Sequence, residues 1–395
     1  MIQFYNKVRL VAAISAVAFV AASPFDAFAN SPVLEPVVQS GTPLPAAAGV
    51  ESNALKTALI APKATTEDAR RHYETTAYRG LWFDASGDAG KAEALVAVLD
   101  NSGEHALPDG KYNTPLLKAA LAAARSGDPS ALAAAEIALT NAFLSYARDL
   151  SSGVLEPRRV DRDLHVFPQR PEAPFLLSGL ARASDVPAYL AGLAPRHPHY
   201  AALKAELDVL ANMAVTSAWG ETAPQGGSIR LGQRGPRVEA IRARLAAMGD
   251  YKPATPALDA TVYDEGLEMA VRVFQKRHGL NDDGVIGKRT VTAMNQSAAY
   301  RAGQVVVNME RLRWLNRDLG HKHVLVNQAD YNVKVIEGDQ VLFSERVVIG
   351  KSRKHRTPEF SDEMTHMVFN PTWHVPYSIA SKEILPKLQE DPEYL

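Results

Sequence analysis

Serine and histidine side chains near the end of the chain have the types needed for nucleophilic hydrolysis. His366 and His374 lie close in sequence to Ser361 and Ser378. A serine becomes a nucleophile only where a histidine base, an orienting acid and oxyanion-stabilising donors lie together. The sequence indicates neither the acid nor the donors, so we expect these four residues to be surface or hydrogen-bonding groups. A serine hydrolase is our weakest functional hypothesis.

Thiol chemistry is excluded within these 395 residues, because the sequence contains no cysteine. Disulfides and thiolate metal ligands are excluded for the same reason. Two histidine-containing segments, Arg196–His199 and His321–His323, invite the hypothesis of a metal site. No carboxylate or further histidine lies at a helical ligand spacing from them, so we predict no bound metal. We expect no other cofactor.

Two charged segments have competing interpretations. The acidic segment Asn281–Gly284 lacks the alternating ligands and the final Glu of an EF-hand loop, so we predict a turn and not a calcium site. The basic run Lys351–Arg356 is typical of a solvated loop after a strand, with contact to an anionic polymer as the alternative. The whole chain is balanced, with 43 Lys and Arg against 44 Asp and Glu, which gives no reason to expect a nucleic-acid partner.

The N-terminus has the pattern of an export signal. Lys7 and Arg9 precede an apolar run, Leu10–Ala22, that is too short to span about 30 Å of hydrocarbon comfortably. The small-residue site Ala27–Ala29 follows it. We predict a signal peptide over residues 1–29, cleaved after Ala29, and an exported chain without a transmembrane anchor. An uncleaved anchor is the alternative.

The length of the chain, 395 residues, suggests two or three domains, and 46% hydrophobic residues indicate that they are folded. Residues 30–65 are rich in Pro, Ala, Ser and Gly and are predicted to be a flexible linker. A helical scaffold domain is predicted over 66–220. Within it, Asn113 and Asp128 each stand at a predicted helix start that contains a proline. Gly153 ends the helix that follows Asp128, in which apolar residues recur on one face: Leu132, Leu139, Phe143, Tyr146 and Leu150.

Residues 228–297 form a predicted unit of three helices. Two apolar stripes at helical spacing belong to its core, and a short third helix is expected between Gly287 and Met294. The stripes are Val238, Ile241, Leu245 and Met248, and Leu267, Ala270, Val271 and Phe274.

From about Gln304 the hydrophobic pattern becomes strand-like. A helix is predicted again over Ile379–Leu388, where Pro386 should bend or end it. The predicted strands are Val305–Val307, Val324–Val326, Tyr331–Val335, Val341–Ile349 after a turn at Glu337–Gln340, and Met367–Phe369.

The three-helix unit resembles a peptidoglycan-binding module. Its opening, Leu231–Gly235, is followed by Val238, Leu245 and Gly249 in the order typical of that module. The resemblance implies that peptidoglycan is the partner and that the groove between the helices holds it. The sequence singles out no substrate-binding residue there. Matching residues of the second half are Ala270, Phe274, Gln275, Gly279, Leu280, Asp283, Gly284, Ile286, Gly287 and Thr290 to Asn295.

The last segment resembles the entrance to a YkuD-type L,D-transpeptidase catalytic domain of the large periplasmic branch. Asn308–Trp314 is close to that branch's signature, and Arg79–Trp82 and Leu193–Tyr200 resemble its helical scaffold. Further matching residues are Val347, Ile349, Gly350, Lys351, Thr357, Pro358, Phe360, Ser361, Asn370, Pro371, Trp373, Val375, Pro376, Ser378 and Ile379.

The resemblance implies a multidomain α+β fold: a helical scaffold domain, a three-helix peptidoglycan-binding module and an incomplete, β-rich catalytic domain over 303–395. In the family, a cysteine in a Ser-x-Gly-Cys-x-Arg motif, assisted by a histidine in a His-Gly-Thr-like motif, transfers acyl groups between stem peptides. Neither motif occurs here, and we expect both to lie beyond the position matched by Leu395.

We therefore predict a periplasmic protein of peptidoglycan remodelling, cell-wall biogenesis and cell shape. The chain as given would hold no catalytic residue and be inactive. The alternative is a non-catalytic peptidoglycan-binding protein of the cell wall.

Overall fold

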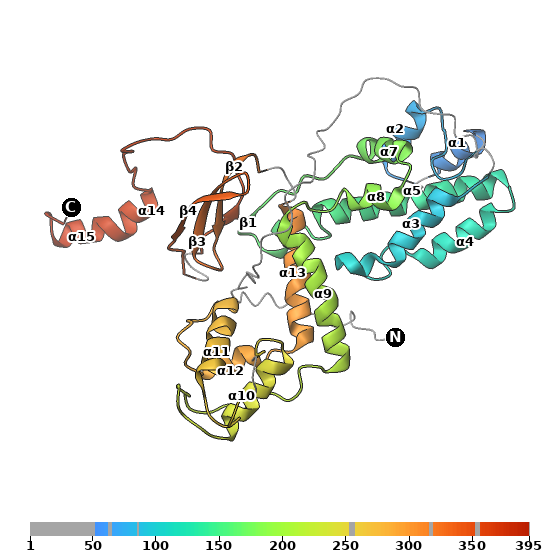
Figure 1. Ribbon diagram of the computed structural model, residues 1–395. Coiled ribbons are helices and arrows are strands. Elements are labelled where there is room, and N and C mark those ends of the chain that lie inside the picture. The colour runs from blue at the N-terminus through green and yellow to red at the C-terminus, as the bar shows by residue number, and fades with distance from the viewer. Residues whose placement is uncertain are drawn as a thin grey trace. The chain divides into compact units, whose positions relative to one another are not determined.

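A computed structural model describes residues 52–61, 65–84, 87–252, 257–315, 319–351 and 356–394, and Figure 1 labels its elements. These residues divide into two units, one ending at Glu359 and one beginning at Phe360. The predicted signal peptide lies outside the described residues.

Seven helices share the first hydrophobic core of the larger unit. Its longest helix, α5, begins at a capping carboxylate, because Asp128 accepts a hydrogen bond from the Ala131 N–H at 2.8 Å. It ends before Gly153, whose φ is +89°, so both predicted ends are confirmed. The seven helices are α1 (Ser52–Ile60), α2 (Glu67–Thr75), α3 (Gly90–Asp100), α4 (Thr114–Ala124), α5 (Pro129–Ser152), α7 (Ala173–Arg182) and α8 (Val186–Ala191), with the short helices η1 (Ser102–His105) and α6 (Pro157–Val160) between them.

Helix α1 corrects the prediction of a flexible linker over 30–65. Leu55 and Leu59, four residues apart, are fully buried in the same core as α5. Burial of two leucines outweighs the loop-like composition of the surrounding segment. The linker prediction is wrong for 52–61, and its earlier part lies outside the described residues.

A buried carboxylate holds the segment that resembles the family's scaffold. Glu136 of α5 is completely buried and accepts hydrogen bonds from the backbone N–H groups of Leu81 at 2.6 Å and Trp82 at 3.3 Å. The Tyr73 hydroxyl donates to the same carboxylate at 2.8 Å. Burial raises the pKa of Glu136 to about 7. These bonds fix the chain around Trp82 against α5.

Helices α9 (Pro198–Thr216) and α13 (Ala298–Trp314) lie side by side, and the three-helix module falls between them in the sequence (Figure 1). The module consists of α10 (Pro236–Ala247), α11 (Glu265–Arg277) and α12 (Lys288–Met294). Both predicted apolar stripes are buried, and they share a second core with apolar residues of α9 and α13.

Helix α13 also corrects a predicted strand. Val305–Val307 belong to this helix, so the strand prediction there is wrong. Val305, Met309 and Leu312 are buried at helical spacing. The prediction failed because three consecutive valines favour a strand when they are considered alone. The boundary at 303 between the predicted domains stays a prediction, but a helix crosses it.

A three-stranded antiparallel sheet follows, in the order β2, β3, β4. Its strands β2 (Lys322–Asn327), β3 (Asn332–Glu337) and β4 (Gln340–Arg346) confirm three predicted strands, although β4 ends earlier than predicted. Val335 of β3 lies opposite Val324 on one side and Phe343 on the other. A separate two-stranded pairing joins β1 (Leu164–His165) to β5 (Glu359–Phe360).

The unit from Phe360 onward is irregular before it becomes helical. Met367–Phe369 form no strand, so that prediction is wrong, and their side chains are exposed. The predicted helix is present as α14 (Tyr377–Ile379), the π-helical segment η2 (Ala380–Ile384) and α15 (Leu385–Glu390). The helix does not end at Pro386, because α15 continues to Glu390. A π-helical segment directly precedes the turn that contains this proline.

Candidate functional site

The three-helix module is organised around buried polar side chains. Arg242 of α10 pairs with Asp264 at 2.8 Å and donates to the Tyr251 hydroxyl at 2.5 Å. The Tyr263 hydroxyl donates to the carbonyl of Gly284 at 2.6 Å. These contacts tie the loops of the module to α10 and to one another.

Gln275 of α11 fixes the acidic segment that resembled a calcium loop. Its amide donates to the Val285 carbonyl at 3.0 Å and accepts from the Gly284 N–H at 2.9 Å. Asp283 accepts the Val285 N–H at 2.9 Å, and that hydrogen bond is the main cause that lowers the pKa of its carboxyl. Asp283 therefore serves the fold of this segment.

The outer side of α11 carries exposed side chains suited to contact with a partner. Met269 is 65% exposed and Val273 is 53% exposed, and Lys276 continues the same face toward the end of the helix. Their spacing of four and three residues places them on one side. We call Met269, Val273 and Lys276 the α11 face. It combines apolar contact area with one positive charge.

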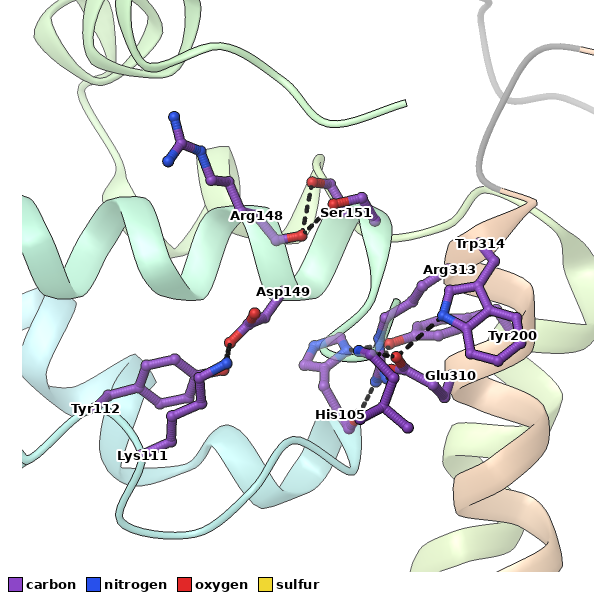
Figure 2. Close-up of polar contacts among 12 residues, drawn as sticks. His105, Lys111, Tyr112, Arg148, Asp149, Ser151, Tyr200, Glu310, Arg313 and Trp314 are labelled. Atoms are coloured by element: carbon purple, nitrogen blue, oxygen red, sulfur yellow. Dashed lines mark hydrogen bonds and ion pairs between the residues drawn. The ribbon is translucent and has the colours of Figure 1, made fainter. Parts of the chain in front are cut away.

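The signature segment Asn308–Trp314 forms a buried joint between α13 and the scaffold. Figure 2 shows Glu310, Arg313 and Trp314 gathered at this joint. Arg313 is 1% exposed and pairs with Glu310 at 2.9 Å. The other carboxylate oxygen of Glu310 accepts from Trp314 Nε1 at 3.1 Å and from the Leu155 N–H at 2.8 Å. The two buried charges thus neutralise each other within a hydrogen-bonded network.

The same arginine contacts two other parts of the scaffold. Its guanidinium donates to the His105 carbonyl and to the Tyr200 hydroxyl, the latter at 3.1 Å. The His105 ring stacks on Tyr200, and burial is the main cause that lowers the pKa of His105 to about 4. His105 is therefore a neutral packing residue at neutral pH. Arg313 joins η1, α9 and α13 at one point.

Ion pairs connect Arg356 and Glu359, at the start of β5, to Asp161 and to α13. Arg356 pairs with Asp161 and, at 3.2 Å, with Glu359, while Arg311 of α13 also pairs with Glu359. The pairing with Asp161 is the main cause that raises the pKa of Arg356. Arg356 is thus engaged within the protein and is not a free charge of a solvated loop. Residues 352–355 of the basic run lie outside the described residues.

The structure does not bring the serine and histidine candidates together. His366 Nδ1 lies 3.0 Å from the Thr365 hydroxyl, and His374 Nε2 lies 3.5 Å from the Thr372 hydroxyl. Within 356–394, no hydrogen bond joins either histidine to Ser361 or Ser378. The geometry gives no nucleophile and base pair of the kind required for serine hydrolysis.

The histidine segments serve local structure. His197 caps α9, since its Nδ1 accepts from the His199 N–H at 3.2 Å, and the two rings lie 4.7 Å apart. Burial is the main cause that lowers the pKa of His197 to about 4, and the nearby His199 and His323 act in the same direction. His323 contacts the Gly320 carbonyl at 3.4 Å. In the described ranges, no three His, Asp or Glu side chains are grouped to hold a metal ion.

Comparison with protein families assigns the three parts of the chain. Residues 67–207 match the "Scaffold domain", residues 234–294 the "Putative peptidoglycan binding domain" and residues 321–395 the "L,D-transpeptidase catalytic domain". The chain thus matches three domain models in order, and the last of them is an L,D-transpeptidase catalytic domain. The resemblance inferred from its motifs is confirmed, as is the multidomain α+β fold.

Two curated proteins are similar to this chain over shorter stretches. A "Putative L,D-transpeptidase" of Haemophilus influenzae is 28% identical over 92 residues, which cover 23% of this chain and 18% of that protein. The "N-acetylmuramoyl-L-alanine amidase CwlM" of Mycobacterium tuberculosis is 37% identical over 84 residues, which cover 20% of each chain. The chain therefore spans about a fifth of the length of the curated relatives that it matches.

The sequence contained the family signature, but it did not predict the contacts that Glu310 and Arg313 make. Glu310 and Arg313 stand three residues apart on one helix, a spacing that permits an ion pair. Their partners His105, Leu155 and Tyr200 come from distant parts of the sequence, so only the structure identifies the joint.

Proposed function

We propose that this protein binds peptidoglycan outside the cytoplasm and takes part in its remodelling as a member of the L,D-transpeptidase family. The observation that carries the proposal is the order of the matches: scaffold, peptidoglycan-binding and catalytic domains in one chain. The proposal includes export by the signal peptide over residues 1–29 into the periplasm. None of the described helices is both long and apolar enough to cross a membrane.

Within the proposal, the module between α9 and α13 holds the polymer. Its loops are fixed by Arg242, Tyr263 and Gln275, and its α11 face offers exposed apolar and basic side chains. The joint at Arg313 then keeps α13, which leads out of the module toward β2, against the scaffold. Binding by the module would bring the polymer to the protein whose catalytic segment follows.

The acyl-transfer step of the family needs a cysteine thiolate, which the 395 residues do not supply. Among the described residues, the serines and histidines after Phe360 do not form a replacement site. We propose that these 395 residues supply peptidoglycan binding for a protein of this acyl-transferring family. A role as a non-catalytic wall-binding protein is the second candidate. Sequencing the gene beyond codon 395 for the Cys and His motifs separates the two.

Retention on purified sacculi tests the proposal. Tyr200, near the start of α9, contacts Arg313, near the end of α13, so the two helices run antiparallel and the module joins their other ends. Replacing residues 221–296 with a short Gly-Ser linker should remove the module and leave the helix pair. The full chain should sediment with sacculi, and the replacement variant should stay in solution.

Circular dichroism and the thermal transition of the first helical core provide the control for folding. Equal sedimentation of both proteins would place binding outside the module. Failure of the full chain to sediment would overturn the proposal. A serine-reactive fluorophosphonate should label neither protein, and stoichiometric labelling of the full chain would instead revive the serine hydrolase.

A further inference from the structure

The scaffold contains a pocket of about 580 Å³ that none of the contacts above uses. Its volume lies in the range of small-molecule sites. Most of its lining residues have polar side chains, and they come from the segment before α2, the last turns of α5 and the segment before α7. The wall includes Thr65, Thr66, Ser145, Arg148, Ser152 and Arg170.

Arg148 is the group in this wall whose charge is not neutralised by a described residue. Its Nε donates to the Pro171 carbonyl at 3.4 Å, and within the described ranges no acid pairs with it. Arg170, the other arginine of the wall, is exposed and pairs with Glu156 at 3.2 Å. The guanidinium of Arg148 is half-buried and keeps two NH₂ groups for a ligand.

The acid next in sequence does not cancel this charge. The carboxylate of Asp149 lies 2.5 Å from Lys111 Nζ and accepts the Tyr112 hydroxyl at 2.8 Å. Figure 2 shows Lys111, Tyr112 and Asp149 on one side of α5 and the Arg148 guanidinium on the other. The pocket therefore presents a net positive charge with hydroxyl groups beside it.

We propose that this pocket binds a carboxylate of a peptidoglycan stem peptide, with Arg148 as its anchor. A planar guanidinium offers parallel N–H groups that match the two oxygens of a carboxylate. Stem peptides carry free carboxylates, and the volume accommodates a few of their residues. The choice of ligand rests on the proposed function, whereas the location of the site rests on the pocket itself.

The test is titration of the full chain with the stem tetrapeptide released from sacculi by an amidase, followed by calorimetry. Arg148→Gln should weaken binding by about tenfold or more, the effect of losing one charge-assisted pair. Arg148→Lys should recover only part of the affinity, because the ammonium lacks the planar fork. The same peptide with its carboxylates amidated should bind the unaltered chain as weakly as the normal peptide binds Arg148→Gln.

Arg125→Gln is the matched control, because Arg125 is a scaffold arginine paired with Glu93 on the surface and removing it changes net charge equally. It should bind the tetrapeptide as the unaltered chain does. Ser145→Leu narrows the pocket without a change of charge and should also weaken binding. This variant tests the pocket independently if Arg148→Gln does not fold. Thermal melting must show that each variant is folded.

The proposal is overturned if the folded Arg148→Gln and Ser145→Leu variants bind as well as the unaltered chain, or if the unaltered chain does not bind at millimolar peptide. Sedimentation with sacculi separates this failure from that of the proposed function. If the chain sediments with sacculi but does not bind the tetrapeptide, the proposed function stands and the pocket proposal fails. If the chain neither sediments nor binds the tetrapeptide, both proposals fail.

Discussion

At the scale of single residues, the pair of Arg313 and Glu310 explains why α13 stays against the scaffold. Arg313→Met should destabilise the helical part by roughly 3–5 kcal/mol, because it leaves the Glu310 carboxylate buried without its partner. Arg311→Met is the matched control, since Arg311 is partly exposed and an exposed pair contributes less than about 1 kcal/mol. Urea unfolding followed by circular dichroism measures both. Equal losses would refute the special role of Arg313.

The buried Glu136 makes a second prediction, on pH. Burial raises its pKa in the folded state from 4.5 to about 7, so between these values the folded protein holds a proton that the unfolded chain releases. The contribution of Glu136 to stability is therefore full below about pH 4.5 and is lost as pH rises toward 7.

Glu136→Gln should flatten the fall in melting temperature between pH 5 and pH 7. The exposed Glu67→Gln, on α2, should leave that fall unchanged. Melting curves at several pH values test this. An identical slope in the unaltered chain and in Glu136→Gln would show that Glu136 does not titrate in this range.

At the scale of elements, the close approach of α5 to α13 depends on Gly153. A Cβ there would lie 2.7 Å from both Glu310 Oε1 and the Trp314 ring, and the φ of +89° is already unfavourable for a side chain. Gly153→Ala should cost roughly 2–4 kcal/mol, from backbone strain and overpacking together. Gly127→Ala has a similar φ of +76° with open space around it, and should cost only roughly 1 kcal/mol. Similar losses of stability for Gly153→Ala and Gly127→Ala in thermal melts would contradict a close approach of Glu310 and Trp314 to Gly153.

Elements with their own start, stop and periodicity were predictable from sequence. The ends of α5 at Asp128 and Gly153 and the stripes of the module are local signals, and all were confirmed. Val305–Val307 and Met367–Phe369 were short apolar runs without such signals, and neither is a strand. In the first run, tertiary burial along α13 decided the outcome.

The candidate site also has parts that were predictable from sequence and parts that were not. Family motifs located the module and the signature in sequence, because both are contiguous. The joint around Arg313 and the pocket around Arg148 each assemble residues more than a hundred positions apart, and no local pattern predicts such contacts.

At the scale of the whole molecule, the scaffold and the module differ from the sheet in how far their apolar side chains are buried. The scaffold and module have closed cores, whereas the strands of the sheet expose apolar side chains, with Val324 49% and Phe343 53% exposed. Exposed apolar faces of this kind mark candidate interaction surfaces.

Hydrogen–deuterium exchange of the full chain, with and without solubilised peptidoglycan, tests the central claim most directly. The account predicts that the polymer slows exchange in residues 228–297, most strongly along α11 beside Met269 and Val273, while α3 and α4 exchange at an unchanged rate. Unchanged exchange throughout 228–297 at saturating polymer would contradict the account.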